Sequence, residues 1–236
     1  MHNTEIPILL SAAFLIAICF PVYMIASLVR KYVSLNQSIM TFWVIIVFYL
    51  LYLIVVGYAS IKGTFSENTL PPKIVQLTTI PLLLFYLGIV FNIKWYKMLL
   101  KSIPVEEFIL LHRFRLIGSF FLVLLLLGLL PRVFALIAGL GDIITAITSI
   151  WIAKLIKEGR TKAHSWALVW NSFGFLDILI TSTTAVLLTK ISMETGAPGV
   201  EVLTVFPFCF IPAFAPATII FLHITIYRKL LVEKFR

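Results

Sequence analysis

The sequence predicts an all-α polytopic membrane protein, a bundle of seven transmembrane helices with the N-terminus outside and the C-terminus cytoplasmic. Three observations predict it. Of the 236 residues, 61% are hydrophobic and only 12% are charged, apolar runs recur along the whole chain, and Lys and Arg gather on alternate connections. Because a soluble domain carries about 25% charged residues, we expect no separate soluble domain. Residues 1–236 are therefore interpreted as a single transmembrane domain.

Each predicted span is an apolar run close to the length that a bilayer requires. A hydrocarbon core about 30 Å thick needs about 20 residues of helix. The predicted spans are 7–29, 40–61, 73–92, 115–130, 133–155, 166–189 and 204–227. One helix over 115–155 would be about 60 Å long, twice the core thickness. We therefore expect a tight hairpin at Pro131–Arg132 between the fourth and fifth spans.

The distribution of Lys and Arg predicts the orientation. The segments after spans one, three, five and seven hold fifteen of these residues, and the opposite side holds four. Positive charge accumulates on the cytoplasmic side, which gives the orientation stated above. We expect a multi-pass protein of the cell membrane, plasma or inner, with anionic lipids at its cytoplasmic face. The net charge of +9 is explained in this way, and no nucleic-acid partner is expected because no soluble basic module exists.

The longest cytoplasmic connection is predicted to be 93–114. Within it, Ser102, Pro104, Glu106 and Glu107 have the order typical of a helix start, with a capping residue, a proline and acids in the first turn. We interpret this stretch as an amphipathic lead-in to the fourth span.

Asp142 and Asp177 are the only aspartates of the chain, and both lie deep inside predicted spans. A charged carboxylate at the bilayer centre costs about 3 kcal/mol even on the mildest scale. Each aspartate lies roughly 16–20 Å from the cytoplasmic boundary at 1.5 Å per residue. Spans five and six are joined by a short loop, so we expect the two carboxyls at one level near the midplane. Two neighbouring acids do not both ionise easily, so one is expected to hold a proton.

Other polar residues accompany this pair. Thr145 follows Asp142 at i+3 and Thr181 follows Asp177 at i+4, on the same helical faces. Asn171 and His223 are expected to form a second layer near the inner interface. The prolines of span seven are expected to expose backbone carbonyls toward a cavity. The candidate ligand- or proton-binding residues are Asp142, Asp177, Asn171, His223, Thr145 and Thr181.

No metal or cofactor is predicted, and no catalytic residue is identified. Only one histidine falls inside a predicted span, too few for a histidine-rich metal centre. The chain lacks the nucleophile-elbow, phosphate-loop, zinc-protease and CxxC motifs.

Three short patterns in the C-terminal part of the chain support a family resemblance. They are P-x₇-G-x-G-D from Pro131 to Asp142, W-N-x₂-G-x₂-D from Trp170 to Asp177, and I-P-A-F-x-P-x₆-H from Ile211 to His223. Together they resemble a group of uncharacterised bacterial integral membrane proteins with no known activity. The resemblance implies a bacterial multi-pass protein and implies no reaction.

Three functions remain open from the sequence. The favoured one is a small-solute or proton-coupled transporter, or a ligand-binding membrane protein, in which the aspartates line a midplane pocket for a small polar or cationic ligand. A second is a non-catalytic assembly or sensing protein whose polar groups hold the helices together. A third is an intramembrane lipid-modifying enzyme with an aspartate as general acid–base and His223 assisting. The sequence favours a protein that is not an enzyme.

Overall fold

The computed structural model describes residues 6–67 and 69–233, and every regular element within these residues is helical. Seven helices of this part of the chain are long and apolar enough to cross a membrane, so the predicted all-α class with seven candidate spans is confirmed. The seven are Ile8–Tyr32, Gln37–Ile61, Val75–Asn92, Val105–Leu126, Arg132–Lys157, Ala163–Thr195 and Phe210–Leu231.

Five of the spans are continuous α-helices, and the other two are built from segments. Three of the continuous helices coincide with their spans: α1 (Ile8–Tyr32), α7 (Arg132–Lys157) and α8 (Ala163–Thr195). The other two, α2 (Leu35–Ile61) and α9 (Phe210–Glu233), extend slightly beyond the second and seventh spans. The third span joins π-helical turns (Val75–Thr79 and Phe85–Ile89), α3 (Ile80–Leu84) and a final 3₁₀ turn (Val90–Asn92). The fourth joins α5 (Val105–Leu111), a 3₁₀ segment (His112–Gly118) and α6 (Ser119–Leu126).

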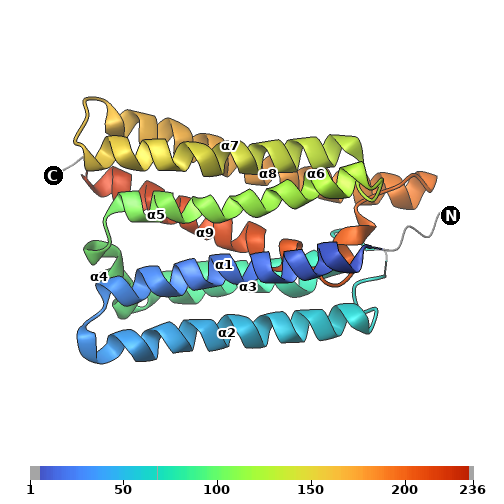
Figure 1. The fold of residues 1–236 in the computed structure, drawn as a ribbon, viewed down its shortest axis with the longest axis horizontal. Helices are drawn as coiled ribbons and strands as arrows, with labels where there is room; N and C mark the ends of the chain where they lie inside the picture. Colours follow the sequence, from blue (N-terminus) through green and yellow to red (C-terminus); the bar gives the residue numbers. More distant parts are fainter. Residues whose placement is uncertain (1–5, 68, 234–236) are drawn as a thin grey trace.

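The spanning helices run side by side along the long axis, with α9 in the middle of the bundle (Figure 1). α9 packs against α8, α3, α5 and α2, and it is the most completely buried span. α2 lies at the outer edge (Figure 1). On α8, a stripe of large apolar side chains at three- and four-residue spacing is exposed on the outside, namely Trp166, Val169, Phe173, Leu176 and Ile180. Such a stripe suits contact with lipid tails rather than water.

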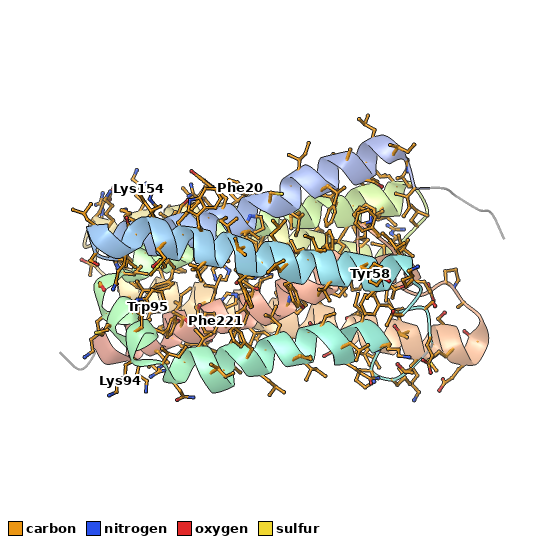
Figure 2. The ribbon with its side chains drawn as sticks, turned by 90° about the horizontal axis from the view of Figure 1, so that it is seen from below. Phe20, Tyr58, Lys94, Trp95, Lys154 and Phe221 are labelled. Carbon is orange, nitrogen blue, oxygen red and sulfur yellow. The ribbon has the colours of Figure 1, made fainter. Side chains whose placement is uncertain are left out.

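One end of the bundle carries a short helix that does not span. α4 (Lys94–Ser102) turns the chain between the third and fourth spans. Its Lys94 and Trp95 lie at the same end as Lys154 of α7 (Figure 2). Tyr96 anchors α4 to the core, because its hydroxyl pairs with Thr225 Oγ1 of α9 at 2.8 Å.

The fourth span begins earlier than predicted. The expected range 115–130 becomes Val105–Leu126, so the connection expected over 93–114 contains α4 and the first half of a span. The predicted helix start is confirmed in part, since α5 begins at Val105 with Glu106 and Glu107 in its first turn. Ser102 is not its capping residue: it ends α4, and its hydroxyl donates to the Met98 carbonyl at 3.0 Å. α5 opens the span itself rather than a lead-in to it. Arg113 and Arg115 therefore lie within a span, and the Lys and Arg split becomes thirteen against four.

The loops near the site agree with the predicted hairpins. α6 ends at Leu126 and α7 begins after Pro131, so the fourth and fifth spans are separate, as expected. α7 and α8 are adjacent and antiparallel (Figure 1). The seventh span differs from the predicted 204–227: residues Glu201–Thr204 form a separate 3₁₀ turn, and α9 runs from Phe210 to Glu233.

Candidate functional site

The 3₁₀ segment His112–Gly118 supplies the centre of the site. A 3₁₀ helix has three residues per turn, so side chains at i and i+3 lie directly above one another. His112, Arg115 and Gly118 follow this spacing, and all three are buried on the side that packs against α7. Arg115 is fully buried, with a side-chain exposure of 0%. The tightened backbone thus directs a row of one histidine, one arginine and one glycine into the bundle.

Arg115 bridges the two aspartates of neighbouring helices. Its Nε donates to Asp142 Oδ1 of α7 at 2.6 Å, and its Nη2 donates to Asp177 Oδ2 of α8. Its Nη1 donates to the backbone carbonyl of Gly174 at 3.2 Å. A guanidinium presents its donors in a planar fork, which suits two carboxylates approaching from different directions. The two acids therefore lie at one level, held by a cation that sequence reasoning had assigned to the membrane edge.

Three glycines allow this close approach. A methyl group added at Gly118 would overlap the Asp142 side chain, and one added at Gly141 would overlap the Asp177 carboxylate. A methyl group at Gly174 would lie 2.7 Å from His223 Cε1. Small residues let membrane helices approach closely, and at these three positions the space is occupied by the polar side chains of the site.

His223 of α9 completes the polar cluster. Its Nε2 lies 3.3 Å from Arg115 Nη1, and its Nδ1 lies 2.8 Å from Asn171 Oδ1. Arginine is only a donor, so Nε2 accepts and Nδ1 carries the hydrogen that Asn171 Oδ1 accepts. The Asn171 amide nitrogen in turn donates to the backbone carbonyl of His223 at 3.1 Å. In this arrangement the imidazole is neutral, and a proton on Nε2 would place two donors against each other.

His112 lies one 3₁₀ turn before Arg115, and its ring packs against the ring of His223. The ring centroids are 4.2 Å apart, and His112 is fully buried. Both of its ring nitrogens are enclosed without a hydrogen-bond partner. Buried polar atoms are usually satisfied, so the His112 ring differs in this respect from the His223 ring, whose two nitrogens are both bonded.

A cavity of about 110 Å³ opens beside Asp142. Its wall is formed by α7, α8, α9 and the first turn of the third span, and it is mainly apolar. Asp142 contributes the carboxylate, and Thr181 and Ser182 contribute hydroxyls whose oxygens are buried without a partner. The side chain of Asp142 retains 13% exposure although it is bonded to Arg115. The carboxylate therefore connects the buried ion cluster to this cavity.

The proline within α9 shapes the opposite wall. Pro216 has no N–H to donate to the carbonyl of Pro212, one helical turn earlier. That carbonyl accepts instead from Thr79 Oγ1 of the third span at 2.6 Å. Both prolines line the cavity. The expected carbonyl is thus freed by a proline, but it is bonded to a neighbouring helix rather than directed into the cavity.

The structure places the six predicted residues in three kinds of surroundings. Asp142, Asp177, Asn171 and His223 lie in one connected cluster, whereas Thr181 lines the cavity. Thr145 is fully buried with its hydroxyl unpartnered. The shared pocket expected for the two aspartates is not what the structure has: Asp142 lines the cavity and Asp177 does not, and they share a guanidinium instead.

Two depth predictions are corrected. His223 was expected nearer the inner interface than the aspartates, yet it contacts the guanidinium that binds both of them, because α9 continues to Glu233. A single intramembrane histidine was expected, but the spans also contain His112, in the fourth, and His164, in the first turn of the sixth. His112 was missed because it fell in the connection predicted over 93–114, and Arg115 because it stood at the first residue of the predicted span 115–130. Their three-residue spacing to Gly118, and the missing counter-charge for two aspartates, were the available signals.

The charges of the cluster do not cancel. With both carboxylates ionised, one guanidinium and two carboxylates carry a formal charge of −1. A proton, or a cation bound at Asp142, would neutralise the group. Within the described residues, no group of three or more His, Cys, Asp and Glu side chains is placed to hold a metal ion.

Comparisons with known proteins give one match. The profile of a family described as a domain of unknown function, DUF8737, matches residues 71–231, which include the whole site. No curated protein and no solved structure matches the chain significantly.

Proposed function

The chain belongs to the DUF8737 family, and from the chemistry of its site we propose that it is a small-solute carrier of the membrane. In this proposal it binds a polar or cationic solute near the midplane and couples its movement to a proton. The observation that carries the proposal is the buried Arg115–Asp142–Asp177 cluster, whose formal charge is unbalanced and which borders a cavity through Asp142. Ionisable groups at membrane depth commonly mark such pathways.

Irregular helices around the cluster support the same reading. The third span has π-helical turns, the fourth has the 3₁₀ segment, and α9 contains Pro216. In carriers, sites near the midplane are typically formed where helices are interrupted. All three interruptions lie beside the cluster or line the cavity, so the helices that would have to move are those that contact the solute.

The other two functions have less support. An assembly protein needs polar groups only to join helices, and it would not require buried hydroxyls left unpartnered around an empty space, as at Thr181 and Ser182. For the enzyme with an aspartate as general acid–base, Asp142 does reach the cavity, but the assisting His223 does not line it, and its Nε2 is engaged by Arg115.

Localisation and orientation are part of the proposal. We place the protein in the bacterial cell membrane with its N-terminus outside, on the basis of thirteen Lys and Arg against four. The exposed Lys94, Trp95 and Lys97 of α4 suit a cytoplasmic surface rich in anionic lipid headgroups.

The proposal is tested by reconstitution into liposomes and electrophysiology on a solid-supported membrane. Small amines, alcohols and carboxylates are added in turn, at several pH gradients, and charge displacement is recorded. We expect a protein-dependent current for one solute class, lost in Asp142→Asn and Asp177→Asn. Glu194→Gln, an exposed acid at the end of α8, is the control. The proposed coupling would be excluded if no solute gave a current. It would also be excluded if both Asn variants gave the same current as the wild type.

A further inference from the structure

The lining of the cavity beside Asp142 favours one ligand chemistry. We propose that the solute is a small primary amine in its ammonium form, with an apolar body that fills the cavity and the ammonium group at Asp142. This inference rests on the proposed function and names the solute class of the same site. It is carried by three features of the cavity: charge, hydrogen-bonding groups and size.

The charge of the site selects a cation. The carboxylate that reaches the cavity belongs to a group with a formal charge of −1, since Arg115 offsets only one of the two aspartates. Among the residues that the structure describes, no Lys, Arg or His lines the cavity. A carboxylate or phosphate ligand would therefore meet a net negative group without a partner, and its desolvation would be uncompensated.

The hydrogen-bonding groups select a primary ammonium. Such a group has three N–H donors, and the cavity offers the Asp142 carboxylate and the free hydroxyl oxygens of Thr181 and Ser182. A third hydroxyl of the lining, on Thr79, is already donating to Pro212. A quaternary ammonium has no donor and would leave both free hydroxyls unsatisfied, which costs affinity.

The size limits the apolar body. The cavity measures about 110 Å³, whereas an apolar cavity of about 150 Å³ accommodates benzene. A chain of about four carbon atoms is the corresponding scale. Ile178, Ala185, Ile211 and Ile219 are among the side chains that would contact it.

The test is a binding assay on the full chain in lipid nanodiscs, with tritiated n-butylamine as the probe at neutral pH. Competitors share the four-carbon body and differ in the head group: n-butylamine, 1-butanol, butyltrimethylammonium and butyrate. We expect saturable binding that unlabelled n-butylamine displaces, with 1-butanol and butyltrimethylammonium weaker by about tenfold and butyrate without effect. Equal competition by butyrate, or no saturable binding, overturns the proposal.

Variants assign the binding to this cavity. Asp142→Asn is expected to weaken binding by about tenfold or more, and Thr181→Val combined with Ser182→Ala by about fivefold. Thr183→Val makes the same change on an exposed position of α8 that does not line the cavity, so its affinity should stay unchanged. If Asp142→Asn does not fold, the test relies on the double variant Thr181→Val with Ser182→Ala. Wild-type affinity in this double variant overturns the proposal.

The binding and transport assays fail independently. Saturable amine binding without solute-driven current would support the ligand class and remove the carrier. Current driven by another solute class, lost in the aspartate variants but without butylamine binding, would support the carrier and remove the ligand class.

Discussion

At the scale of single residues, Arg115 determines the electrostatics of the bundle. Its side chain is fully buried and its donors reach two carboxylates, a backbone carbonyl and an imidazole from three different helices. A buried charge is tolerated when it is paired and hydrogen-bonded, and removal of one partner leaves the other charges uncompensated. Arg115 is thus itself a buried charge that needs partners, and it is also the counter-charge that the two aspartates need.

Arg115→Met should lower the free energy of unfolding by about 3–5 kcal/mol, because two buried carboxylates lose their counter-charge. Arg115→Lys should recover only part of this, since an ammonium cannot reproduce the planar fork. Thermal unfolding in detergent measures both. Combining Arg115→Met with Asp142→Asn and Asp177→Asn should restore much of the stability. A single Arg115→Met variant as stable as the wild type would contradict the ion cluster.

His223 gives a second prediction at this scale. His223→Leu removes the acceptor for Arg115 Nη1 and the donor for Asn171 Oδ1, so we expect a loss of about 1–3 kcal/mol. Tyr227→Phe is the matched control one turn further along α9, where one partly buried hydrogen bond to Ser172 is lost. The same unfolding measurement compares them, and an equal, small effect of the two would mean that the His223 contacts contribute little.

At the scale of elements, the site depends on helices that approach closely at glycine. On α7, the space that a side chain at position 141 would occupy is filled by the Asp177 carboxylate of α8. The two helices therefore cannot keep this geometry if Gly141 is replaced by a larger residue. The 3₁₀ segment has the same relation to α7 through Gly118. The ion pairs of the site therefore form only if the helix backbones approach closely at these glycines.

Gly141→Ala should destabilise the protein by about 1–3 kcal/mol, because the methyl group displaces a carboxylate that binds Arg115. Gly88→Ala provides the control, since no atom lies within 4 Å of the added methyl group. Alanine is favoured over glycine in helices, so this control should be neutral or slightly stabilising in unfolding experiments. If both substitutions changed the free energy of unfolding equally, the contact between Gly141 and Asp177 would not contribute to stability.

The elements also show which parts of the site could be predicted from the sequence. Asp142 and Asp177 stand out because an acid is rare in apolar runs, and their common level followed from counting along a hairpin of two helices. Arg115 did not stand out, because a hydropathy window treats an arginine as if it faced lipid. Its real environment is set by residues 27 and 62 positions away, and such pairings are not encoded in any local pattern.

At the scale of the whole molecule, α9 joins two halves of the bundle. On one side it contacts α8 through Asn171 and His223, and on another it contacts the third span through Thr79. The fold class followed from composition and periodicity, since seven apolar runs are a global property. The central place of α9 could not be predicted, because all seven runs are similarly apolar and helix order in space depends on side-chain packing.

The predicted orientation can be measured in intact cells. In a variant with Cys19 and Cys209 replaced by Ser, Lys62→Cys should react with a membrane-impermeant maleimide from outside. Lys97→Cys, on α4 at the opposite end of the bundle, should react only after permeabilisation. Both lysines are exposed, so accessibility within the protein is matched. Labelling in the reverse order would invert the orientation.

The 3₁₀ segment has a mechanical consequence. A 3₁₀ helix turns about 120° per residue and rises about 2.0 Å, against about 100° and 1.5 Å in an α-helix. If His112–Gly118 relaxed to α-helix, His112 would rotate about 60° relative to Arg115, and the segment would shorten by about 3.5 Å. Arg115 lies within this segment and pairs with Asp142 and Asp177. A change between the two helix types would therefore couple these ion pairs to rotation and axial displacement of the fourth span.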